Sequence, residues 1–184
     1  MFTDGKQKYL GIASHCVVGD DCALAGNMLV QPSIIDGGGK DDVIGEVYQC
    51  TDLTQPELTT DFCLITPKVD VDPNILGLDL KLTGKYADVK PGMQVVMSGR
   101  TSGVREGTIM ATNVMVKIEY QCGYKVFKNG ILATALSLEG DSGAPVITKD
   151  TGDYIGYIVG GSSTMSLIGY GKLLEKEFKV KPVA

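Results

Sequence analysis

The 184-residue chain lacks several features that would point to a metalloprotein. It has no tryptophan and only one histidine, and its five cysteines form no Cys-x-x-Cys pair. Zinc sites need closely spaced cysteine and histidine ligands, so we expect no metal and no other cofactor. Cys16 and Cys22 are close enough for a small loop disulfide, but reduced, buried thiols are the simpler expectation for a cytosolic protein.

Long apolar runs and clusters of basic residues are also missing. No run approaches the roughly 18 apolar residues of a membrane span, and the first residues lack the basic-then-apolar layout of a secretion signal. We therefore expect a cytoplasmic protein without a membrane partner. The net charge is −5 and the pI is about 4.9, which argues against a nucleic-acid partner because such surfaces need clustered Lys and Arg.

Short strands separated by turn residues fill most of the chain. Residues 172–180 alone have helical spacing, with Leu173, Leu174 and Phe178 on one face. The rest predicts an all-β fold of sandwich or barrel type. Pro32 indicates an edge or a bend. The strands are expected at residues 8–14, 27–35, 43–50, 62–66, 94–98, 107–119, 131–138, 144–148, 154–159 and 165–170.

Residues 70–82 carry Asp-Pro and Leu-Gly breaks, and we expect a connector with one short strand there. This connector is the best boundary between two halves of a single domain. The expected division is residues 1–75, residues 76–171 and a C-terminal helix and tail over residues 172–184.

One stretch, Leu-Glu-Gly-Asp-Ser-Gly-Ala-Pro-Val at residues 138–146, has the composition of a nucleophile loop. Ser142 lies between two glycines, which allow a tight turn and a close approach of the backbone to a substrate. Such a turn can direct the N–H groups of Gly140 and Ser142 at one point, as an oxyanion hole requires. The alternative is an ordinary turn, because the same residue types dominate turns.

A nucleophilic serine needs a base, and the base needs an anion that orients it. The only histidine, His15, ends an apolar strand, although a lone histidine is more often structural. Asp61 opens another apolar strand, where a buried carboxylate needs a partner such as an imidazole N–H; a plain strand-end aspartate is the alternative. The order His15, Asp61, Ser142 is that of the chymotrypsin family and not of subtilisin or the α/β-hydrolases.

On these residues the chain resembles the trypsin-like (chymotrypsin-fold) serine peptidases, and its layout is most similar to those of bacteria and their plant relatives. The resemblance covers nearly the whole chain. Its segments are residues 14–16, 61–65 and 140–145, together with residues 31–32, 36–38, 44–45, 98–103, 107–109 and 160–164.

The resemblance implies two antiparallel six-stranded β-barrels with the active site between them. It implies that Ser142 is the nucleophile, that His15 is the general base and then the acid, and that Asp61 orients His15. Gly140 and Ser142 would form the oxyanion hole, and residues 157–161 would pair with a substrate in extended conformation.

Two departures from the family stand out. Only 14 residues precede His15, whereas in the family about two strands of the first barrel come before the histidine. Either the chain is a fragment, or the first barrel is open, or a further segment or another copy in an oligomer completes it. Asp141 is then expected to bond to backbone or to a basic side chain, because Met1 is a poor partner for it.

The substrate-binding residues implied by the resemblance are Leu136, Ser137, Val159, Gly160 and Gly161. Leu136 stands six residues before the serine, where peptidases that select Lys or Arg carry an acidic residue. An uncharged side chain at the cleaved residue is therefore expected, and Glu139 would attract a basic residue at a neighbouring subsite.

Other motifs carry no chemistry in this interpretation. Residues 37–40, Gly-Gly-Gly-Lys, are not followed by Ser or Thr and fail the phosphate-loop pattern. Arg100 is expected to be structural, with anion binding as the alternative. Cys16 and Cys63 are expected in the core, because neighbours along a strand face opposite ways.

The predicted function is a serine endopeptidase that acts on peptides through an acyl-enzyme, and the alternative is a catalytically inactive binding or assembly module with the same fold.

Overall fold

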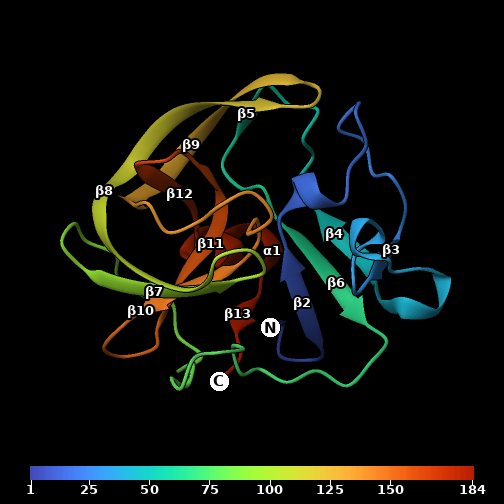
Figure 1. Ribbon diagram of the computed structural model, residues 1–184, viewed down its shortest axis with the longest axis horizontal. Helices are drawn as coiled ribbons and strands as arrows, with labels where there is room; N and C mark the ends of the chain where they lie inside the picture. Colours follow the sequence, from blue (N-terminus) through green and yellow to red (C-terminus); the bar gives the residue numbers. More distant parts are fainter.

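The computed structural model describes residues 1–184, and two β-sheets with one short helix form it (Figure 1). Both sheets are antiparallel except for one short strand. The first sheet has the order β13-β1-β2-β6-β4-β3, with β1 (Phe2–Thr3), β2 (Lys8–Ile12), β3 (Met28–Val30), β4 (Val43–Cys50), β6 (Cys63–Pro67) and β13 (Lys181–Pro182). The second has the order β12-β11-β10-β7-β8-β9-β5, with β5 (Glu57–Leu58), β7 (Gln94–Gly99), β8 (Gly103–Tyr120), β9 (Gly123–Thr134), β10 (Pro145–Thr148), β11 (Tyr154–Gly161) and β12 (Met165–Tyr170).

The second sheet closes on itself, whereas the first does not. Strand β12 also pairs with β9, with Leu167 opposite Leu132, so that six strands form a barrel. Strand β5 adds to β9 from outside and runs parallel to it, which differs from the expected all-antiparallel arrangement. No pairing joins β13 to β3. The all-β expectation is confirmed, with one closed barrel and one open six-stranded sheet.

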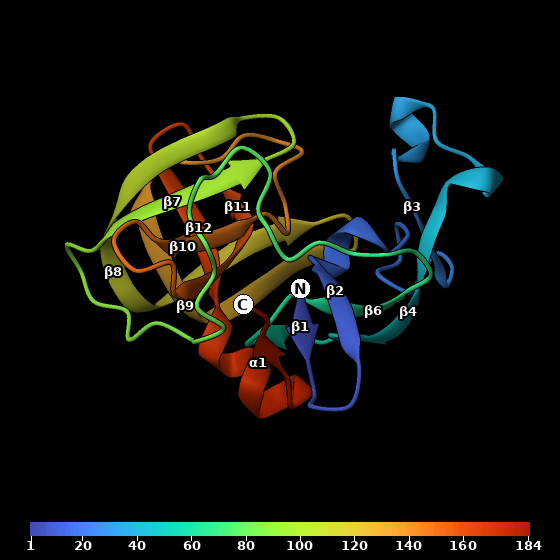
Figure 2. The same cartoon turned by 90° about the horizontal axis from the view of Figure 1, so that it is seen from below.

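The strands form where apolar residues are frequent, with burial that is continuous along most of β11 and alternates along the end of β8. The short strands that the sequence did not predict depend on distant partners. Strand β4 has the expected bounds, whereas β9 ends at Thr134 and leaves residues 135–138 in a loop. The helix α1 covers Gly171–Phe178, and the tail beyond it forms β13, which pairs with β1 (Figure 2). No strand occurs in the connector of residues 70–82, contrary to expectation. A strand of two residues such as β13 carries no local pattern, so only its partner reveals it.

An aromatic cluster holds the first sheet against the barrel and α1. Phe62 is 1% exposed and lies between Phe2, Tyr157 and Phe178, with ring centroids 4.7 to 5.9 Å away. Ring pairs of this geometry add to the free energy gained by burial. Because Phe62 directly follows Asp61, this cluster also fixes the position of that carboxylate.

Four of the five cysteines are paired, so the expectation of reduced thiols is wrong for them. Cys22 bonds to Cys122, and Cys50 bonds to Cys63. Cys16 is free and exposed, so the expectation that it lies in the core is wrong. Two disulfides are typical of proteins in oxidising compartments, which weighs against the expected cytoplasmic location; that location stays a prediction. The structure contains no helix with the length and apolar character needed to cross a membrane.

The β8–β9 hairpin of the barrel is attached to the first half of the chain. The Cys22–Cys122 disulfide joins its tip to the loop after β2. Close by, Lys125 Nζ donates to the Thr54 carbonyl at 3.3 Å, in the segment that leads into β5. The two sheets are therefore linked covalently and by hydrogen bonds at this end.

Truncating Phe62 tests how much the aromatic cluster contributes to stability. Phe62→Ala is expected to lower the free energy of unfolding by about 3–5 kcal/mol, because it removes a fully buried ring and leaves a cavity. Urea denaturation measures this. Leu76→Ala is the control, since Leu76 is 90% exposed and its truncation should change stability by no more than about 0.5 kcal/mol. Equal effects of the two substitutions would contradict the assignment.

Candidate active site

His15 and Asp61 lie together at the edge of the first sheet. His15 is on the 3₁₀ turn Ser14–Cys16, just after β2, and Asp61 comes just before β6. The His15 Nδ1 atom is 2.6 Å from Asp61 Oδ2, and the His15 backbone N–H donates to Oδ1 at 3.0 Å. The sequence placed His15 at the end of a strand, whereas the strand ends at Ile12 and the turn points the imidazole at the carboxylate.

Asp61 is fully buried, and two tyrosines from the barrel reach it. The Tyr157 hydroxyl accepts a hydrogen bond from the Asp61 backbone N–H at 2.9 Å. The Tyr120 hydroxyl donates to Asp61 Oδ2 at 3.0 Å. The sequence marks neither tyrosine as a partner of Asp61, because each lies on a strand of the other sheet and nothing in its local pattern points to this contact.

The surroundings of His15 favour its protonated form. Burial opposes protonation of the imidazole, but the hydrogen bond with Asp61, the neighbouring Cys16 side chain and the negative charge of Asp61 outweigh it and raise the pKa of His15 above 6.5. Nδ1 is held by the carboxylate, so the other ring nitrogen, Nε2, is the one left for chemistry.

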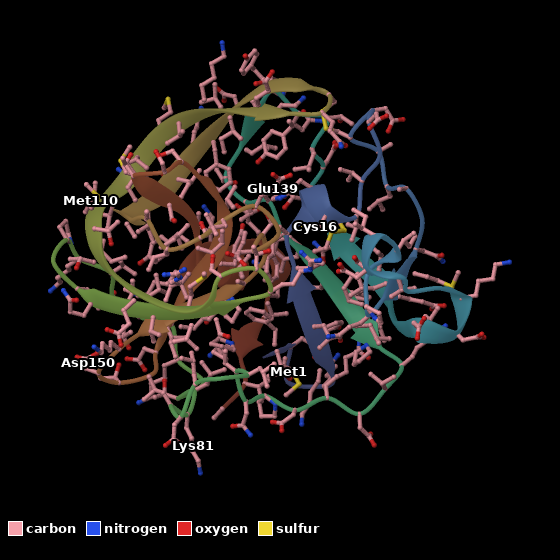
Figure 3. The ribbon with its side chains drawn as sticks, in the orientation of Figure 1. Met1, Cys16, Lys81, Met110, Glu139 and Asp150 are labelled. Atoms are coloured by element: carbon pink, nitrogen blue, oxygen red, sulfur yellow. A yellow bond between two sulfur atoms is a disulfide. The ribbon has the colours of Figure 1, made fainter.

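The loop that carries Ser142 packs directly against the turn that carries His15. Gly143 has a φ of +85°, and a Cβ at this position would lie 2.9 Å from the backbone nitrogen of Ala13. The Cys16 Sγ atom is 4.0 Å from the Ser142 carbonyl oxygen. Figure 3 shows Cys16 where the first sheet meets the barrel. The structure therefore brings Ser142 to the pair of His15 and Asp61, although the Ser142 hydroxyl makes no hydrogen bond with either.

Several backbone N–H groups of the serine loop have no hydrogen-bond acceptor in the chain. The N–H groups of Gly140 and Ser142 are among them, whereas those of Asp141, Gly143 and Ala144 all donate to backbone carbonyls. Unpaired N–H groups on alternate residues of a tight turn form a receptor for a negatively charged oxygen.

Asp141 holds this loop in shape. Its buried carboxylate accepts hydrogen bonds from the N–H groups of Thr101, Ser102 and Leu138 at 2.7, 3.1 and 2.8 Å. Burial alone would raise the pKa of Asp141, but these bonds lower it below 3.8. Of the two expected kinds of partner, the backbone is the one found. Arg100 is structural, as expected, because its Nε donates to Asp36 at 3.0 Å.

A cavity of about 600 Å³ opens beside His15. Val159, Gly160 and Gly161, three of the expected substrate-binding residues, line it, together with Tyr120. The other two do not line it. Leu136 is 2% exposed, and its N–H, like that of Ser137, is bonded to the hydroxyl of Ser166. Most of the lining is apolar, including Val18, Val116, Ile118, Leu132, Met165 and Leu167.

One edge of β11 is free next to this cavity. Pairing with β10 ends with Pro145 opposite Tyr157, and Ile158 is the last residue bonded to the serine loop, through Ala144 and Gly143. A free strand edge is a template for a further strand, so an extended chain could pair with β11 beyond Ile158.

No family model matches this chain, and no curated protein matches it. The fold does match solved structures. A serine protease specific for glutamic acid has a TM-score of 0.74 at 22% identity, covering 99% of this chain and 90% of its own. Thermobifida fusca protease A has a TM-score of 0.70 at 22% identity, and the match covers 100% of this chain and 88% of the protease. An α-lytic protease homologue has a TM-score of 0.70 at 15% identity, and the match covers 99% of this chain and 89% of the homologue. The chain thus has the chymotrypsin-like fold of bacterial serine proteases.

The pair of His15 and Asp61 should make stability depend on pH. Because folding raises the pKa of His15, the stabilisation by the pair is fully present below about pH 6.5 and is lost as the pH rises through the folded-state pKa. The loss is about 1.4 kcal/mol for each pH unit by which folding raises this pKa. We expect the difference in free energy of unfolding between the wild type and Asp61→Asn to shrink from about pH 6.5 upwards in urea titrations. A difference that does not change with pH would show that the imidazole and carboxylate are not coupled.

Proposed function

We propose that this chain is a serine endopeptidase in which Ser142 is the nucleophile, His15 the general base and Asp61 the residue that orients His15. The observation that carries the proposal is the hydrogen bond of 2.6 Å between His15 Nδ1 and the buried carboxylate of Asp61, next to a serine loop in which the N–H groups of Gly140 and Ser142 are unpaired. A base, its orienting anion, a hydroxyl and an anion receptor are the parts that acyl transfer needs.

Each part has one step to perform. The Ser142 hydroxyl attacks the carbonyl carbon of the peptide bond and gives its proton to His15 Nε2. The N–H groups of Gly140 and Ser142 bind the oxygen that becomes negative. The His15 imidazolium then gives the proton to the leaving amine, and an acyl-enzyme forms. Water, activated by the same nitrogen, attacks the ester, releases the acid and returns the proton to Ser142.

The missing hydrogen bond between Ser142 and His15 is compatible with this mechanism. In proteins without substrate, such contacts are often long and tighten only when substrate binds. The base must be neutral to accept a proton. The raised pKa of His15 therefore places the rise of kcat/KM with pH above pH 6.5.

The proposed substrate is an extended peptide that pairs with the free edge of β11. Its side chains on the N-terminal side of the cleaved bond would enter the apolar cavity beside His15, so apolar residues are favoured there. The glutamic-acid-specific neighbour is described as using three histidines in substrate binding. This chain has a single histidine, which the proposal assigns to the base, so that way of binding an acidic side chain does not apply.

The second candidate is a catalytically inactive binding module. Two observations favour it: the first sheet is open, and the Ser142 hydroxyl makes no hydrogen bond with His15. In that case the free edge of β11 and the cavity would bind a peptide without cutting it.

Labelling with a fluorophosphonate separates the two candidates. The intact mass should rise by one adduct on Ser142, and Ser142→Ala should show none. Asp61→Asn should slow labelling by about 10³- to 10⁴-fold, because it presents the wrong imidazole tautomer. Ser163→Ala, which removes an exposed serine, is the matched control and should label at the wild-type rate. An unlabelled wild-type protein would favour the binding module.

A peptide library tests the substrate preference. Cleavage should be most frequent where large apolar residues precede the cleaved bond, and the cleaved residue itself should be uncharged. Mass spectrometry of the products gives the profile. A profile dominated by Arg or Lys at the cleaved residue would contradict this part of the proposal and leave the peptidase itself intact.

A further inference from the structure

The carboxylate of Asp61 accepts three hydrogen bonds, and they come from only two residues. His15 donates two of the three, from its backbone N–H to Oδ1 and from its Nδ1 to Oδ2. Tyr120 supplies the third, from its hydroxyl to Oδ2 at 3.0 Å. Tyr120 is therefore the only residue besides the proposed base itself that binds this buried charge.

Tyr120 reaches Asp61 from the other sheet. It is the last residue of β8, at the tip of the barrel's β8–β9 hairpin, whereas Asp61 precedes β6 of the first sheet. Both are buried, with 9% and 0% of their surfaces exposed. Two residues beyond Tyr120, Cys122 forms the disulfide with Cys22 that fixes this tip to the loop after β2.

The hydroxyl of Tyr120 stays protonated and can act only as the donor towards this carboxylate. Burial and the negative charge of Asp61 both raise the pKa of Tyr120 far above its usual value of 10. A hydrogen bond to a charged acceptor is stronger than a neutral one, so the hydroxyl stabilises the ionised form of Asp61.

We propose that Tyr120 is a positioning residue, supplied by the barrel, that fixes the ionised Asp61 carboxylate beside His15 and, by sharing Oδ2 with Nδ1, limits how strongly this carboxylate stabilises the imidazolium. This role rests on the proposed function of His15 and Asp61 and acts through them, since Tyr120 need not touch the reacting atoms.

The role has a definite effect on His15. Oδ2 shares its negative charge between the imidazole and the tyrosine hydroxyl, so Tyr120 competes with the imidazolium for that oxygen. When the hydroxyl is removed, the full charge of Oδ2 faces the imidazolium and stabilises it. Tyr120 therefore keeps the base from becoming too strongly protonated, as well as fixing the carboxylate in place.

Other titratable groups near His15 could affect the same measurement, and each is identifiable. Cys16 lies on the same turn and raises the pKa of His15. Tyr157, from β11, bonds the Asp61 backbone and not its carboxylate. Lys117 and Glu119, from β8, lie on the lining of the cavity. None of these changes when the Tyr120 hydroxyl alone is removed.

The test uses the only histidine of the chain, which gives a single imidazole Hε1 signal in a proton NMR pH titration. Tyr120→Phe removes one oxygen and keeps the ring, and it should raise the pKa of His15 by roughly half a unit to one unit. The matched control is Tyr124→Phe, on the same hairpin, where the side chain is 59% exposed; it should leave the titration unchanged.

A second measurement observes the Tyr120 hydroxyl proton directly in the wild-type protein. In the wild type, the Tyr120 hydroxyl proton should give its own downfield signal, protected from exchange with water, with a cross-peak to the Tyr120 ring. A titration that does not move in Tyr120→Phe, or that moves to lower pH, would overturn the proposal. A wild-type spectrum without the protected hydroxyl proton would also overturn it.

Fluorophosphonate labelling separates this role from the function on which it rests. At a pH below the pKa of His15, labelling of Tyr120→Phe should be about three- to tenfold slower than wild type, which is the same shift converted to a fraction of neutral imidazole. If the NMR shift is found and Ser142 does not label, the positioning role stands and the peptidase proposal fails. If Ser142 labels equally fast in both proteins, the positioning role fails and the peptidase proposal stands.

Discussion

The structure depends most on one buried charge, the carboxylate of Asp61. A carboxylate without exposure to water costs several kcal/mol unless donors surround it. No lysine or arginine side chain bonds it, so the donors come from His15 on one sheet and Tyr120 on the other. The two sheets can therefore not shift relative to each other at this point without leaving the charge unpaired. The hydrogen bonds to this one carboxylate therefore fix both the relative position of the two halves and the geometry of the candidate site.

A second buried carboxylate, that of Asp141, accepts its hydrogen bonds from a different kind of donor. All three of its donors are backbone N–H groups of nearby loops, so it fixes the shape of the serine loop and not the position of the sheets. The arrangement leaves the N–H groups of Gly140 and Ser142 without acceptors. One aspartate thus shapes the loop of the proposed anion receptor, while the other orients His15, the proposed base.

The sequence predicted those parts whose cause is local. The strand over residues 43–50, the turn made by the glycines around Ser142 and the apolar face of α1 follow from neighbouring residues, and the structure has them. It did not predict β5, β13, the disulfides or Tyr120, because each depends on a partner far along the chain. The expected place of Cys16 in the core was wrong for a different reason: the strand ends at Ile12 and a 3₁₀ turn covers Ser14–Cys16, so strand alternation no longer applies there. The turn exposes Cys16 and points His15 inwards.

An open first sheet raises the question of what keeps His15 in place, and the contacts across the interface answer it. The first sheet has no closing pair of strands, so contacts from outside it add to the hydrogen bond from the Ser14 N–H to the Asp61 carbonyl. Tyr157 binds the backbone of Asp61, Glu177 on α1 binds the hydroxyl of Thr60 at 2.7 Å, and the Cys22–Cys122 disulfide ties the loop after His15 to the barrel. These three contacts come from β11, α1 and the β8–β9 hairpin, all outside the open sheet. The barrel and α1 therefore support the open sheet at and beside the residues that carry the candidate site.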